Sequence, residues 1–172
     1  MNVPLIFLPR HTGEVPAQQA EGESPKGHLS MYIDRQNLFG QNQAVTVSAP
    51  STDHIDLGSA RDIGNGTPLE ILVLCTETVT AAGAATVQVA LQSDDNGSFS
   101  SPANLVLSDA IPKASLVAGT EILRVPVPYG CERYLRLNFT VGTGPLTAGK
   151  FTSGLVPMRQ ANTAYPSGYA VA

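Results

Sequence analysis

The stretch from Ser51 to Gly97, STDHIDLGSARDIGNGTPLEILVLCTETVTAAGAATVQVALQSDDNG, carries the two clearest strand patterns in the chain. Residues 69–76 are almost continuously apolar and β-branched, which predicts a strand buried on both faces. In residues 86–92, apolar side chains occupy every second position, which predicts a strand with one face on a core. Small residues at 80–85 join the two segments, so the simplest interpretation is a long β-hairpin. The Asn96-Gly97 pair that follows favours the positive φ angles of a tight turn.

Length and composition favour a single all-β domain. A chain of 172 residues can bury about 70% of its unfolded surface as one domain. Only 14% of the residues are charged, and 13 prolines and 16 glycines are spread along the chain. This composition favours many short strands joined by turns over long helices.

Six further segments are predicted strands, which brings the total to about eight. Turns at this spacing predict a two-sheet antiparallel β-sandwich, most naturally a jelly roll. An immunoglobulin-like sandwich is the alternative, but the chain has no tryptophan and so lacks one hallmark of that fold. A short helical turn is expected within residues 31–39. The six segments are 44–49, 54–57, 104–107, 121–127 (at a sheet edge, because of Pro126 and Pro128), 133–141 and 146–156, the last with a bulge at Gly149 or Gly154.

The sequence divides into an N-terminal arm at 1–30, a sandwich body at 31–156 and a C-terminal tail at 157–172. The arm is mostly polar and cannot form a core of its own. Ordering about 30 residues costs tens of kcal/mol, so an ordered arm has to lie on a partner or on a neighbouring copy. The apolar patch of the arm and two tyrosines of the tail are the candidate partner-binding residues: Leu5, Ile6, Phe7, Leu8, Tyr165 and Tyr169.

Charge and hydropathy argue against several partners. The net charge is −4 with no basic run, which argues against nucleic-acid binding. No apolar stretch approaches the roughly 20 residues of a membrane span, and the start of the chain lacks the basic region of a signal peptide. Cys75 and Cys131 are expected to be free thiols, with a disulfide between them as the alternative, which fits synthesis in the cytoplasm of a host cell.

Candidate chemistry is sparse. His54 and Asp56 share one side of a predicted strand, but without a third ligand they are expected to be a surface pair. Residues 94–97 resemble a fragment of a calcium loop that lacks the later ligands, and residues 64–67 precede a strand instead of opening a helix, so both are expected to be turns. His11 and His28 have no companion at ligand spacing. We therefore expect no catalytic residue, no metal site, no cofactor and no enzymatic activity.

Four motifs together resemble the small capsid cement (decoration) proteins of tailed bacteriophages, including that of a Bordetella podovirus. They are MYIDRQNLF at 31–39, STDHIDLG at 51–58, ARDIGNG at 60–66 and YPSGY at 165–169. The resemblance covers residues 31–172, whereas residues 1–30 precede it. It implies a jelly-roll β-sandwich on the outside of an icosahedral shell built from a different major capsid protein. It also implies sister copies that form a dimer or a trimer and bridge neighbouring capsomers.

The leading hypothesis is thus a non-enzymatic virion protein that stabilises a phage capsid from its outer surface. One alternative is a carbohydrate- or receptor-binding sandwich of the virion, which needs exposed aromatic platforms. Another is a hydrolase on a jelly-roll scaffold, which needs histidines and carboxylates clustered on adjacent strands. Whether the arm binds the shell or a neighbouring copy stays open at this point.

Overall fold

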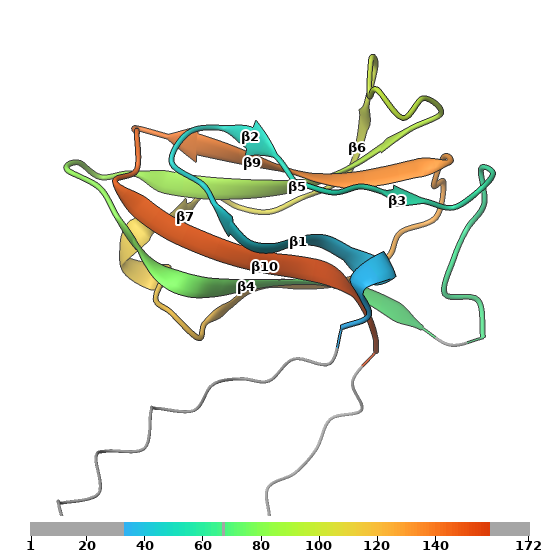
Figure 1. The fold of residues 1–172 in the computed structure, drawn as a ribbon, viewed down its shortest axis with the longest axis horizontal. Helices are drawn as coiled ribbons and strands as arrows, with labels where there is room; N and C mark the ends of the chain where they lie inside the picture. Colours follow the sequence, from blue (N-terminus) through green and yellow to red (C-terminus); the bar gives the residue numbers. More distant parts are fainter. Residues whose placement is uncertain (1–32, 67, 159–172) are drawn as a thin grey trace, which may run out of the picture.

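Ten strands in the residues that the structure describes, 33–66 and 68–158, form two antiparallel sheets packed face to face (Figure 1). The structure is a computed structural model. The predicted all-β sandwich is confirmed. The strands are β1 (Leu38–Ala44), β2 (Ala49–Pro50), β3 (Ile55–Asp56), β4 (Leu69–Thr80), β5 (Thr86–Asp94), β6 (Ala103–Leu107), β7 (Ile111–Pro112), β8 (Glu121–Pro126), β9 (Tyr134–Gly142) and β10 (Ala148–Pro157), with 3₁₀ turns η1 (Arg35–Asn37) and η2 (Lys113–Ser115).

The ten strands are divided between two sheets, and the chain crosses from one sheet to the other several times. One sheet, here sheet A, has the order β1-β10-β4-β8, and the other, sheet B, has the order β2-β9-β5-β6. The short strands β3 and β7 also pair within sheet B, with β9 and β5. The chain passes from one sheet to the other after β1, β3, β4, β7, β8 and β9, and the first and last strands are neighbours. We interpret this connectivity as that of a jelly roll.

The predicted hairpin between β4 and β5 is wrong. β4 pairs with β10 and β8 in sheet A, whereas β5 pairs with β9 and β6 in sheet B. The small residues after Thr80 cross from one sheet to the other, and Ala85 is buried in the core on the way. Hydrophobic patterning indicates which face of a strand is buried. It does not indicate which strand lies beside it.

The start of the body also differs from expectation. The predicted strand at 44–49 is wrong. Ala44 is the last residue of β1, and the next strand, β2, contains only Ala49 and Pro50. β1 begins at Leu38, within the segment where a helical turn was expected, and that turn is confined to η1. The cause lies in β1, whose register with β10 shifts twice and whose Asn42 has φ 50°, so its side chains do not alternate regularly.

The turn after β5 is longer than the predicted tight turn. Neither Asn96 nor Gly97 has a positive φ, and Phe99 takes the left-handed conformation instead, at φ 52°. The Asp94 carboxylate accepts hydrogen bonds from the backbone N–H groups of Asn96 and Ser101, each at 2.9 Å. This side chain therefore fixes a loop wider than a two-residue turn.

The remaining strand predictions hold. Strand β8 lies at the edge of sheet A and ends at Pro126. Strand β10 has its register shifts beside Gly149, as expected for a bulge there. That glycine has φ 152°, and a Cβ at this position would lie 2.8 Å from the side chain of Val79, so the close approach of two strands requires glycine.

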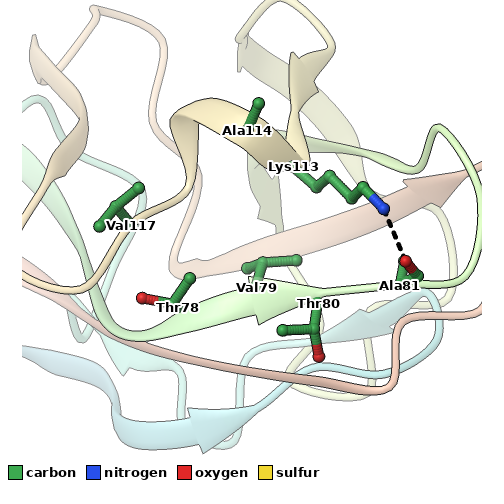
Figure 2. Close-up of a pocket in the computed structure, with 7 residues that line it drawn as sticks. All are labelled: Thr78, Val79, Thr80, Ala81, Lys113, Ala114 and Val117. Carbon is green, nitrogen blue, oxygen red and sulfur yellow. Dashed lines mark hydrogen bonds between the residues drawn. The ribbon is translucent and has the colours of Figure 1, made fainter.

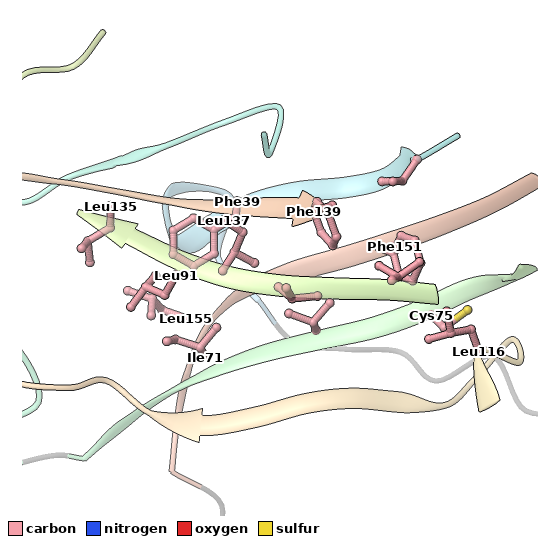
Figure 3. Close-up of a cluster of buried hydrophobic side chains, with 14 of the residues drawn as sticks. Phe39, Ile71, Cys75, Leu91, Leu116, Leu135, Leu137, Phe139, Phe151 and Leu155 are labelled. Carbon is pink, nitrogen blue, oxygen red and sulfur yellow. The ribbon is translucent and has the colours of Figure 1, made fainter. Parts of the chain in front are cut away.

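The core lies between the sheets, where most of the alternating residues predicted to face inward are fully buried (Figure 3), while Val141 at the end of β9 is partly buried. Phe139 of sheet B stacks on Phe151 of sheet A, with ring centroids 5.3 Å apart. Cys75 and Cys131 are free and buried, and burial raises the pKa of both thiols. Other fully buried side chains are Phe39, Ile71, Val73, Val87, Val89, Leu91, Leu116, Leu135 and Leu137.

Candidate interaction surface

Three connections meet at one end of the sandwich, which we call the loop end: β3–β4 (57–68, of which 67 is not described), β5–β6 (95–102) and β8–β9 (127–133). Backbone hydrogen bonds join their bases, from Val127 N–H to Leu69 O at 3.0 Å and from Leu57 N–H to Arg133 O at 2.8 Å. The described chain also starts and ends here, because η1 and the end of β10 lie at this end (Figure 1). The loop end is thus where the segments 1–32 and 159–172 join the sandwich.

The most exposed large apolar side chain of the described residues is Tyr129, at the tip of the β8–β9 loop. It is 78% exposed. The loop beneath it is held firmly: the Asp62 carboxylate accepts hydrogen bonds from the N–H groups of Gly130 at 2.6 Å and Cys131 at 3.3 Å. On the far side of the loop, the N–H of Glu132 donates to the hydroxyl of Ser93 at 2.7 Å. A tyrosine presented on an ordered loop can bind a partner with little further loss of conformational entropy.

A second cluster at the loop end combines aromatic rings with arginines. The rings of His54, Phe99 and Tyr134 meet edge to face, with centroids 5.7 to 6.5 Å apart. Arg133 lies over the Tyr134 ring at 4.9 Å and Arg136 over the Phe99 ring at 4.2 Å. This cluster, here the aromatic cluster, fastens the β5–β6 loop onto the outer side of β9.

Charges in and beside this cluster are paired. Arg133 donates two hydrogen bonds to Asp56, both at 2.9 Å, and these bonds are the main cause that lowers the pKa of Asp56 from 3.8 to about 2. Arg136 donates to the Gln92 side chain at 2.8 Å, and burial lowers the pKa of this arginine. The hydrogen bond from the N–H of Asn96 is the main cause that lowers the pKa of Asp94. These side chains therefore hold the strands and loops of the loop end together.

The residues singled out for metal or nucleophilic chemistry have structural partners instead. His54 packs on two aromatic rings, while Asp56 is bound by Arg133, so the two do not form a ligand pair. In residues 33–66 and 68–158, no three His, Cys, Asp or Glu side chains gather closely enough to hold a metal ion. The same part of the chain holds no helix with the length and hydropathy of a membrane span.

A shallow pocket of about 350 Å³ lies at the opposite end of the sandwich, between the end of β4 and η2 (Figure 2). The Lys113 ammonium donates to the carbonyl oxygen of Ala81 at 2.6 Å across its rim. The lining has no carboxylate, thiol or imidazole to act with that lysine in acid–base or nucleophilic chemistry. The lining residues are Thr78, Val79, Thr80, Ala81, Lys113, Ala114 and Val117.

The six predicted partner-binding residues lie outside the described residues, as do His11 and His28. What the sequence reasoning missed is Tyr129. The signal was present in the order Pro128-Tyr129-Gly130, where two turn-forming residues flank a tyrosine between two strands. The aromatic cluster had no signal in the sequence, because its rings come from three separate connections and strands.

Comparison with known proteins gives one family. The family model described as Bbp16, a name that indicates a Bordetella phage protein, matches residues 39–155, from β1 through β10. No curated protein matches the chain. The match spans more than half of the sequence and nearly all of the sandwich, so the phage relationship expected from the four motifs is supported at the level of the family. This chain belongs to the phage-related Bbp16 family.

Proposed function

We propose that this protein is a non-enzymatic virion protein that binds the outer surface of an icosahedral phage capsid and bridges neighbouring capsomers. Its partners in this proposal are the major capsid protein of the shell and sister copies, in a dimer or a trimer, without nucleic acid or membrane. It would be made in the host cytoplasm and act on the virion surface. Membership in a phage-related family supports the setting, and a β-sandwich without a cluster of reactive groups in the described residues is compatible with a binding role.

The observation that carries the proposal is the organisation of the loop end. A 78% exposed tyrosine stands on a loop that Asp62 and Ser93 hold in place. The same end is where residues 1–32 and 159–172 join the sandwich, so these two segments and the Tyr129 tip can act on one partner together. Several weak contacts made by one chain, and repeated over a shell, combine into strong attachment by multivalency.

The test is a binding assay with expanded capsids that lack the protein. The wild-type chain and the Tyr129→Ala variant are mixed with these shells, the shells are pelleted, and the bound copies are counted. We expect the wild type to saturate at a fixed ratio to the major capsid protein, and Tyr129→Ala to bind at least about thirtyfold more weakly, since truncation of a tyrosine anchor costs about 2 kcal/mol or more. The matched control is Val47→Ala, which truncates a side chain 58% exposed in the β1–β2 loop at the other end.

The exposed ring of Tyr129 is also the observation that favours the alternative, a carbohydrate- or receptor-binding module. A glycan array separates the two functions. Loss of glycan binding in Tyr129→Ala, together with absence of wild-type binding to shells, would replace the proposed function with the alternative. Equal shell binding by Tyr129→Ala and wild type would show that Tyr129 at the loop end does not contribute to shell binding.

A further inference from the structure

The chain has two Asn-Gly pairs, Asn65-Gly66 and Asn96-Gly97, and both lie in connections of the loop end. We propose that Asn65 is a site of spontaneous deamidation and that the structure protects Asn96 from the same reaction. The proposal goes beyond shell binding, because it concerns a covalent change of the protein itself.

The reaction needs no catalyst. The backbone nitrogen of the following glycine loses its proton and attacks the side-chain carbonyl carbon of the asparagine. A nitrogen–carbon bond forms, the carbon–nitrogen bond of the side-chain amide breaks, and ammonia leaves with the proton. Water then opens the resulting succinimide ring at either carbonyl, which leaves an aspartate or an isoaspartate with one additional negative charge. Glycine permits the attack because it has no Cβ to hinder the approach of its own backbone.

The surroundings of Asn65 leave this approach open. Asn65 is exposed, and none of the side-chain hydrogen bonds among the described residues involves it. The glycines on both sides have left-handed φ angles, 89° at Gly64 and 101° at Gly66. Apart from Gly66 itself and its two chain neighbours, no residue has a heavy atom within 4 Å of the place where a Cβ of Gly66 would stand. Asn65 and Gly66 are thus both exposed, and no residue beyond their chain neighbours packs against Gly66.

The surroundings of Asn96 oppose the approach. Its side-chain carbonyl oxygen accepts two hydrogen bonds from Ser98, from the backbone N–H at 3.0 Å and from the hydroxyl at 3.1 Å. Its own N–H donates to Asp94, and its backbone carbonyl accepts from the N–H of Phe99 at 2.9 Å.

The glycine after Asn96 is confined as well. The ring of Tyr134 lies over Gly97, 3.3 Å from the place where a Cβ would stand. Attack on the Asn96 side chain would thus require the release of hydrogen bonds and of a packed ring, and the described part of the chain places neither restraint on residues 65–66. The two Asn-Gly pairs form an internal comparison in one chain.

The test is ageing of the purified full-length protein at mildly alkaline pH and physiological temperature, followed by peptide mapping in a mass spectrometer. Conversion is read as the mass gain of an amide-to-acid exchange, and enzymatic methylation of isoaspartate gives a second readout. We expect Asn65 to be converted about thirty times faster than Asn96, the ratio expected when two ordinary hydrogen bonds protect one site. In denaturant, where the fold is lost, the two sites should convert at similar rates.

Two variants sharpen the comparison. Asn65→Gln should remove most of the isoaspartate formed by the folded protein, whereas Asn96→Gln should leave its amount almost unchanged. Ser98→Ala removes one of the two hydrogen bonds on Asn96 and should accelerate conversion there. Equal rates at the two sites in the folded protein, faster conversion of Asn96, or no conversion of Asn65 over a period in which the denatured chain reacts would each overturn the proposal.

Discussion

Replacement of Asp62 by alanine tests whether this carboxylate holds the Tyr129 tip. The short hydrogen bond from the Gly130 N–H at 2.6 Å is the main loss, and the bond from Cys131 at 3.3 Å adds little. A hydrogen bond to a charged group contributes about 1.5–3 kcal/mol, and solvent exposure of Asp62 places this one at the low end, about 1.5 kcal/mol. For a domain of this size, that loss lowers Tm by about 3–6 °C.

The loss should be shared between stability and binding. Without Asp62 the residues around Tyr129 are free in the unbound protein and have to be ordered on the shell. That ordering costs at most the roughly 1.5 kcal/mol that the lost hydrogen bond supplied, so affinity for the shell should fall by up to about tenfold. Hydrogen exchange of the Gly130 and Cys131 amides provides the local readout, and it should accelerate in the variant.

The matched control for this change is Asp109→Ala, which removes one exposed carboxylate from the connection between β6 and β7. It should leave Tm, shell binding and the exchange of both amides near the wild-type values. If Asp62→Ala leaves the exchange of the two amides unchanged, the carboxylate does not hold the loop. If exchange accelerates while shell affinity stays at the wild-type value, the order of the Tyr129 tip is irrelevant to binding.

Three further predictions concern the sandwich. Phe151→Ala should lower the free energy of unfolding by about 3–5 kcal/mol in urea titrations, because it empties the centre of the core; a loss below 1 kcal/mol would contradict the packing. Gly154→Ala should cost about 1–3 kcal/mol, since its Cβ would lie 2.6 Å from the Asn37 carbonyl oxygen, and an unchanged Tm would argue against that contact. Arg133→Gln should return the Asp56 pKa, about 2 in the wild type, toward 3.8 in an NMR titration. Because the folded-state pKa is lowered, the stabilisation is present above about pH 4 and is lost as pH falls toward 2; equal pH dependence in both proteins would contradict it.

Much of the fold could be predicted from the sequence because burial leaves a local signal. The alternation in β5 placed Val87, Val89 and Leu91 on the core side, and each is fully buried. The proline at 126 placed β8 at an edge. These predictions succeed because a side-chain period of two and a missing N–H are properties of the segment itself.

The partners of each strand could not be predicted in this way. β4 and β5 are adjacent in sequence but belong to different sheets, and their pairing depends on β9 and β10, which lie far along the chain. The loop end likewise depends on contacts between residues that are far apart in the sequence. Asp62 and Gly130 are 68 residues apart, and nothing in either segment indicates their hydrogen bond. A site assembled from such contacts becomes visible only in three dimensions.

The most direct test of the central proposal is site-specific photo-crosslinking on decorated shells. A photoreactive amino acid replaces either Tyr129 at the loop end or Val47 at the opposite end, and the two proteins are bound to expanded capsids and irradiated. The account predicts a crosslink from position 129 to the major capsid protein and none from position 47. A crosslink to the shell from position 47 alone, or saturable binding with no crosslink from position 129, would contradict it.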